Sequence, residues 1–145
     1  MVLLKTLHLF LVLIAQPTQK QADIVEVQAR SIGESYTFYV TISSPDTGCD
    51  QYADWWEVIS EDGELLYRRI LLHSHISEQP FKRSGGPVKL DRNQRVWIRA
   101  HMNNTGYGGQ VFVGSAKDGF KKGTIPADLG LNLDKMDPLP QGCTG

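Results

Sequence analysis

The chain has 145 residues, a length typical of a single domain. Its 15 Lys and Arg side chains nearly balance its 16 Asp and Glu side chains. The resulting formal charge of -1 argues against a dedicated nucleic-acid-binding protein, because such proteins usually carry a basic excess. Hydrophobic residues make up 41% of the chain and charged residues 21%, a balance that excludes a disordered chain, and two cysteines are too few for a disulfide-dense scaffold.

Residues 1–22 are predicted to form a secretory signal peptide. Lys5 precedes an apolar run from Leu9 to Ala15, and a polar stretch follows. The run is shorter than the about 20 apolar residues that a transmembrane helix needs. Cleavage is predicted after Ala15 or after Ala22, and no cysteine follows the run to carry a lipid. We therefore expect a secreted or periplasmic protein whose mature chain has no transmembrane segment; an uncleaved amphipathic or buried helix is the alternative.

Cys49 and Cys143 are the two cysteines of the chain. Export places them in an oxidising compartment, where disulfides form and persist. We therefore predict a disulfide between them, which would close a long loop. Metal ligands or free thiols are the alternative interpretations.

Alternation of apolar and polar residues predicts β-strands after the leader. Phe38, Val40 and Ile42 share one strand face, for example, while Thr37 and its neighbours at alternate positions share the other. The dipeptide Asp-Gly at residues 62–63 separates two such stretches and is typical of a hairpin turn. The expected strands are residues 23–31, 36–44, 53–60, 65–72, 88–90, 95–103 and 110–116.

About seven short antiparallel strands without a helical period predict an all-β, two-sheet sandwich in residues 23–117. The sandwich would be immunoglobulin-like or fibronectin type III-like, and a closed β-barrel is the alternative. Residues 118–145 contain three prolines and no strand pattern, so we expect an irregular tail there. The disulfide would tie the end of this tail to the domain.

Three histidines are candidate metal ligands. His73 and His75 are two positions apart, so both imidazoles would lie on one face of a continuing strand. His101 lies near the end of another predicted strand. Three imidazoles with an open position suit zinc or copper, and the alternative is a set of surface or hydrogen-bonded histidines.

Large polar and aromatic side chains share the strand face opposite the predicted core. Trp97, Arg99 and His101 alternate on this face, and Tyr107 follows just beyond the strand. Exposed aromatic and Arg side chains are typical anchors of interfaces, so Trp97, Arg99 and Tyr107 form a candidate interaction surface. The alternative is that another segment, such as the C-terminal tail, covers Trp97.

Several short motifs resemble a family of small exported bacterial proteins of unknown function. The similar stretches are WWEVISEDGELLYRRIL, HSH followed by EQPF, RSGGPV, RAHM and GYGG, all within residues 55–109. The resemblance implies an exported bacterial protein. It implies no activity, ligand or catalytic residue.

These patterns favour a non-enzymatic binding module that presents the loops at residues 73–87 and 103–109 to a protein or carbohydrate partner. A metal-binding protein or metalloenzyme that uses His73, His75 and His101 is the alternative. A structural accessory domain is a third hypothesis.

Overall fold

The computed structural model of the chain describes residues 12–16 and 18–144. Residues 1–11 and Pro17 of the predicted signal peptide lie outside the described residues, so the leader and its cleavage site stay predictions. In the part of the chain that is described, no helix is long and apolar enough to cross a membrane.

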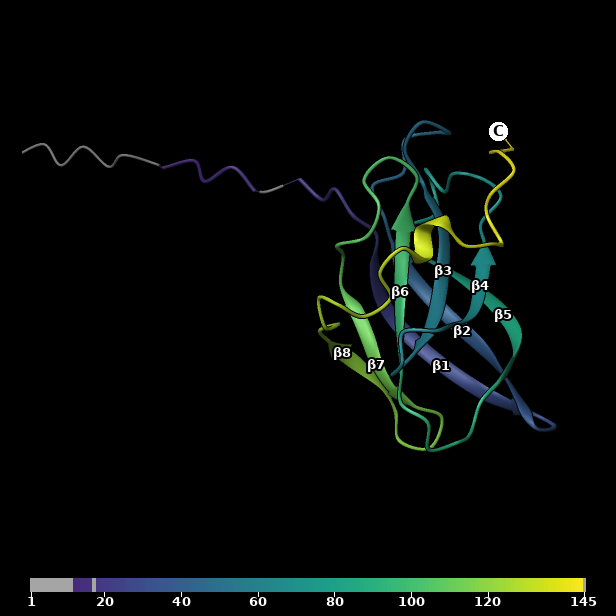
Figure 1. Cartoon of the computed structure of the whole chain (residues 1–145). Coiled ribbons are helices and arrows are strands. Elements are labelled where there is room, and N and C mark those ends of the chain that lie inside the picture. The colour runs from purple at the N-terminus through teal and green to yellow at the C-terminus, as the bar shows by residue number, and fades with distance from the viewer. Residues whose placement is uncertain (1–11, 17, 145) are drawn as a thin grey trace, which may run out of the picture.

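Eight strands within the described residues form two antiparallel sheets that are stacked as layers in Figure 1. The three-stranded sheet has the order β1 (Asp23–Ile32), β2 (Ser35–Ser43) and β5 (Phe81–Lys89). The five-stranded sheet has the order β4 (Leu65–Ile70), β3 (Ala53–Ser60), β6 (Val96–Met102), β7 (Val111–Ser115) and β8 (Gly119–Gly123). The 3-10 helix η1 (Leu133–Lys135) follows the last strand. The predicted all-β class and two-sheet sandwich are confirmed.

The connections between the sheets follow a Greek-key pattern. β3 and β4 belong to the second sheet, and β5 returns to the first sheet beside β2. This order is that of fibronectin type III-like sandwiches, with β8 added beyond β7. At one side of the sandwich the sheets meet, because the Ile24 backbone NH donates to the Gln110 carbonyl at 2.9 Å. At the other side β4 and β5 do not pair, so the strands do not close into the alternative barrel.

The core fills the space between the two sheets with apolar side chains from alternating strand positions. Phe38, Val40 and Ile42 of β2 are fully buried, as their spacing predicts, and Trp56 and Val58 of β3 belong to the same cluster. Burial of each such side chain contributes roughly 1.5–3 kcal/mol, so the sandwich is held together mainly by this layer.

β5 is longer than the sequence predicts. It begins at Phe81 rather than at residue 88 and includes the stretch Gly85-Gly86-Pro87. Proline lacks the backbone NH that each residue of a central strand donates to a neighbouring strand. β5 tolerates it because β5 lies at the edge of its sheet, where the backbone on one side has no neighbouring strand.

β8 lies within the stretch that the sequence predicts as an irregular tail from residue 118. It pairs with β7 from Gly123 to Gly119, so the sandwich continues past residue 117. Its sequence GFKKG lacks the apolar alternation of a half-buried strand because it is an edge strand, and charged lysines are common at such edges.

The C-terminal segment, residues 124–144, crosses the outer face of the five-stranded sheet (Figure 1). The predicted disulfide between Cys49 and Cys143 is present, with the two Cα atoms 5.5 Å apart and 94 positions between the cysteines. Next to it, the Thr144 backbone NH donates to the Leu72 carbonyl at 2.7 Å. The segment is therefore attached to the sandwich along its length.

Candidate functional site

The three predicted metal ligands do not come together. The His73 and His75 rings are neighbours, with centroids 4.4 Å apart, in the segment that follows β4. His101 of β6 pairs with other residues, described below. In the residues the structure covers, no group of three His, Cys, Asp or Glu side chains is placed to hold a metal ion. The structure therefore does not assemble the predicted zinc or copper site.

His101 is held between a carboxylate and an indole. Its Nδ1 lies 2.7 Å from Oδ1 of Asp54, and its ring stacks on Trp55 with centroids 3.7 Å apart. Asp54 reaches the ring because it is the extra residue of a bulge between Ala53 and Trp55. Such a pair supplies two of the three members of a hydrolytic triad. Among the described residues, however, no Ser or Thr hydroxyl hydrogen-bonds to His101, and both cysteines are in the disulfide, so a nucleophile is not assembled.

The His75 side chain is buried beside an aromatic ring, and its ring nitrogens lack hydrogen bonds within the described residues. Its ring stacks on Phe81 with centroids 3.8 Å apart, and neither ring nitrogen has a hydrogen-bond partner among the described residues. Burial is the main cause that lowers the pKa of His75 below its ordinary value, and the nearby charges of Arg83 and His73 add to it. The weaker opposing effect of Asp46 does not restore the pKa, so His75 resists protonation in the folded protein.

The predicted interaction surface of Trp97, Arg99 and Tyr107 lies largely beneath the C-terminal segment. Trp97 is 6% exposed, and its indole Nε1 donates to the Thr124 carbonyl at 3.0 Å. Ile125 packs against the same apolar cluster as Trp97, and Arg99 is 7% exposed. The alternative interpretation therefore holds for Trp97: the tail covers it, and it is not available as an exposed anchor.

A buried ion cluster on the outer face of the five-stranded sheet was not identified by the sequence analysis. Glu57 of β3 is fully buried and lies opposite Arg68 of β4 and Arg99 of β6. Its carboxylate accepts from Nε and Nη2 of Arg68 at 2.8 and 2.6 Å and from Nε of Arg99 at 2.7 Å. We call these three residues the Arg–Glu–Arg cluster. The signal that could have revealed it is the acidic residue Glu57 between the apolar residues Trp56 and Val58 of the strand ADWWEVIS.

The Arg–Glu–Arg cluster also holds the C-terminal segment. Arg68 donates through Nη1 to the carbonyls of Met136 and Pro138 at 2.6 and 3.0 Å. Arg99 donates through Nη2 to the Gly130 carbonyl at 3.0 Å. The two arginines carry two positive charges, and the single carboxylate of Glu57 balances only one of them. The negative ends of these backbone carbonyls therefore stabilise the remaining positive charge. The cluster is therefore a structural attachment point rather than a catalytic site.

Tyr107 completes the packing around this cluster. The guanidinium of Arg99 lies 3.5 Å from the centroid of the Tyr107 ring, a cation–π arrangement. Burial raises the pKa of Tyr107 strongly, and the negative charge of Glu57 adds to the rise. The phenol therefore stays protonated at physiological pH and cannot act as a general base there.

Three loops meet at one end of the sandwich, and we call this region the loop end (Figure 1). The loops comprise residues 44–52, 71–80 and 103–110. Asp46 joins the first loop to the second, because its Oδ2 accepts from the His75 backbone NH at 2.8 Å. This carboxylate is buried, so the link between the two loops is protected from water.

Asn103 joins the third loop to the first. Its Oδ1 accepts from the Tyr52 backbone NH at 2.9 Å, and its Nδ2 donates to the Cys49 carbonyl at 2.8 Å. Cys49 is in turn bonded to Cys143. Side chains and the disulfide therefore connect all three loops and the end of the chain into one unit.

A hollow of about 410 Å³ opens beside the disulfide at the loop end. Ser74 lines it, and the Ser74 Oγ is buried without a hydrogen-bond partner among the described residues. Ile76, which also lines it, is 62% exposed, and the nearby Leu72 is 58% exposed. The complete lining comprises Gly48, Cys49, His73, Ser74, Ile76 and Thr144. Exposed apolar side chains around a hollow whose loops are connected are typical of interaction sites.

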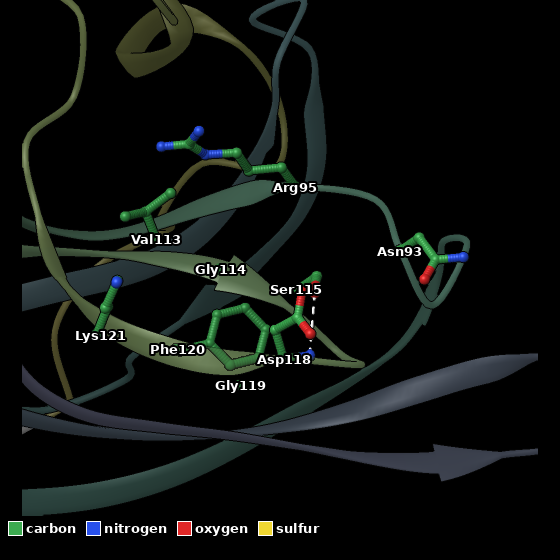
Figure 2. Close-up of a pocket in the computed structure, with 9 residues that line it drawn as sticks. All are labelled: Asn93, Arg95, Val113, Gly114, Ser115, Asp118, Gly119, Phe120 and Lys121. Carbon is green, nitrogen blue, oxygen red and sulfur yellow. Dashed lines mark hydrogen bonds between the residues drawn. The ribbon is translucent and has the colours of Figure 1, made fainter.

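A second hollow, of about 520 Å³, lies between the start of β6 and the β7–β8 hairpin (Figure 2). Arg95 and Lys121 give it a positive charge, and Ser115 and Asp118 close the hairpin turn with hydrogen bonds of 3.1 and 3.4 Å. Both cations are exposed, so solvent screens them, and no unpaired buried donor is found among its described lining residues. This hollow does not point to a particular ligand.

The chain is similar to a protein of the haloarchaeon Halomicrobium mukohataei that carries the name "Putative lipoprotein". The two sequences are 38% identical over 115 residues, which cover 76% of this chain and 57% of the relative. The chain thus spans little more than half the length of that relative. This relative is archaeal, whereas the family suggested by the sequence motifs is bacterial. No protein family and no solved structure matches the chain.

Proposed function

We propose that this chain is an exported, non-enzymatic binding module that engages a protein partner through the loop end. The observation that carries the proposal is the combination of connected loops and exposed apolar side chains there. Leu72 and Ile76 are exposed beside a hollow whose walls are held by the disulfide and by buried hydrogen bonds.

Three features support export. The first residues have the pattern of a signal peptide, and the disulfide between Cys49 and Cys143 suits an oxidising compartment. The name of the haloarchaeal relative describes a lipoprotein, and lipoproteins are held outside the cytoplasm. The location that we propose is therefore extracytoplasmic, either secreted or periplasmic; the lipid attachment of the relative is not part of the proposal.

Connected loops favour binding because they are already ordered before the partner arrives. A flexible loop loses conformational entropy when a partner fixes it, and this loss weakens binding. At the loop end, Asp46 and Asn103 have already fixed the three loops against one another. The exposed apolar surface of Leu72 and Ile76 can then contribute to affinity when a partner covers it.

The proposal predicts that a charge at Ile76 separates the protein from its partner without unfolding it. The experiment compares Ile76→Glu with Val25→Glu, because Val25 is also exposed, at 43%, but lies on β1 of the other sheet. Each variant is expressed in the native host, and envelope extracts are separated on native gels. Thermal unfolding of the purified proteins shows whether each variant is still folded. We expect wild type and Val25→Glu to migrate as a complex and Ile76→Glu as the free chain. Migration of wild type as the free chain, or of Ile76→Glu with the complex, would overturn the proposal.

A further inference from the structure

A groove opens where the two sheets fail to meet, between the edge strands β4 and β5, which lie at the same side of the sandwich in Figure 1. It encloses about 570 Å³, within the range of roughly 300–1,000 Å³ that is typical of small-molecule sites. We call it the edge groove. It is distinct from the loop end, and nothing in the proposed function uses it.

Among the described residues, the edge groove contains a buried hydrogen-bond donor that lacks an acceptor. Arg69 of β4 lines the groove, and its Nε is buried without a partner among the described residues. Trp56, which pairs with Arg69 in register on β3, belongs to the core behind the groove and not to its lining; it is fully buried, and its Nε1 also lacks a partner among the described residues. A buried donor without an acceptor is unfavourable, so the Nε–H of Arg69 calls for an oxygen atom from water or from a ligand in the groove.

Gly85 of β5 lies directly against aromatic side chains of the five-stranded sheet. A Cβ at Gly85 would lie 2.6 Å from Oη of Tyr67 and 3.0 Å from an indole carbon of Trp56. The absence of a side chain at this position therefore lets Tyr67 and Trp56 pack directly behind the wall of the groove. Tyr67 and Gly85 both line the groove.

The chemistry of the lining identifies the class of ligand. Arg69 supplies a positive charge and a planar set of NH donors that match a carboxylate. Ser35, Thr37 and Ser84 supply hydroxyls, which can donate to or accept from hydroxyls of a ligand. Tyr67 adds an aromatic ring for the apolar face of a sugar. We propose that the edge groove binds an acidic saccharide, with the carboxylate of one uronic acid unit on Arg69.

A titration followed by NMR tests this proposal. The probe is digalacturonate, added to the full-length oxidised chain, and the signals followed are the Trp56 indole NH and the Gly85 amide. Digalactose, acetate and inorganic phosphate serve as separate arms. We expect saturable shifts with digalacturonate and at least tenfold weaker binding of digalactose, because the charge-assisted bonds to Arg69 are lost. Acetate and phosphate should also bind at least tenfold more weakly, because they lack the sugar hydroxyls.

Two variants separate binding from fold stability. Arg69→Gln should weaken digalacturonate at least tenfold, whereas Arg95→Gln, at an exposed cation in the other hollow, should leave its affinity unchanged. Absence of saturable shifts with wild type would overturn the proposal, as would equal binding of phosphate. If Arg69→Gln lowered thermal stability but left the affinity for digalacturonate unchanged, the role of Arg69 would be structural only. The proposal would again be overturned.

Discussion

Replacement of Glu57 by glutamine should destabilise the whole domain, although Glu57 lies on the outer face of a sheet. The substitution keeps the shape of the side chain but removes its negative charge. Arg68 and Arg99 would then remain buried without a carboxylate, because both are less than 10% exposed. The C-terminal segment attached to these two arginines should loosen as well.

The size of the effect follows from the three hydrogen bonds to the Glu57 carboxylate, at 2.6 to 2.8 Å. Hydrogen bonds to charged groups contribute about 1.5–3 kcal/mol each, but bonds within one cluster are not additive. Removal of one partner from a buried ion pair typically costs about 3–5 kcal/mol, and we expect Glu57→Gln to fall in that range.

Urea unfolding of Glu57→Gln and Glu78→Gln measures this difference. Glu78 provides the matched control because it forms a two-bond pair with Arg83, yet its side chain is 57% exposed. Solvent screens exposed ion pairs, so Glu78→Gln should have little effect on the free energy of unfolding. Limited proteolysis within residues 131–137 should accelerate in Glu57→Gln alone. Equal, small losses of unfolding free energy in both variants would refute the reasoning.

Three further predictions concern stability. Replacement of Cys49 and Cys143 by serine should lower the free energy of unfolding by up to about 4–5 kcal/mol, because the long loop is no longer closed in the unfolded chain; an unchanged urea midpoint would contradict this. Because the pKa of His75 is lowered in the folded state, the contribution of His75 to the free energy of unfolding should be fully present above about pH 6.5 and should decline as the pH falls below that value. Urea titrations between about pH 5 and 7 should show that His75→Phe flattens this decline. Trp97→Phe removes the hydrogen bond to Thr124 and should cost about 1 kcal/mol, measured as a shift of the urea midpoint.

The strands that face the core could be predicted from the sequence because burial imposes a period of two. The stretch 53–60 matches β3 from Ala53 to Ser60, and the predicted strand 95–103 contains β6. Edge strands carry a weaker signal, since one side of their backbone needs no partner. For this reason β5 tolerates Pro87, and β8 consists mainly of glycine and lysine.

The candidate site was harder to predict because it depends on which strands become neighbours. Sequence spacing placed His73 and His75 together, but the position of His101 depends on β6 pairing with β3, which puts it against Trp55. The Arg–Glu–Arg cluster likewise requires three strands in one register. The disulfide was predictable because its two cysteines are the only pair in the chain.

Site-specific photo-crosslinking in the native host tests the central claim, that the loop end binds a partner, most directly. A photoreactive amino acid is placed at Ile76, and in a separate strain at Leu131, which is 64% exposed compared with 62% for Ile76 but lies on the C-terminal segment. We predict a discrete protein adduct in the envelope fraction from position 76 and none from position 131. Absence of an adduct from position 76, or the same adduct from both positions, would contradict the account.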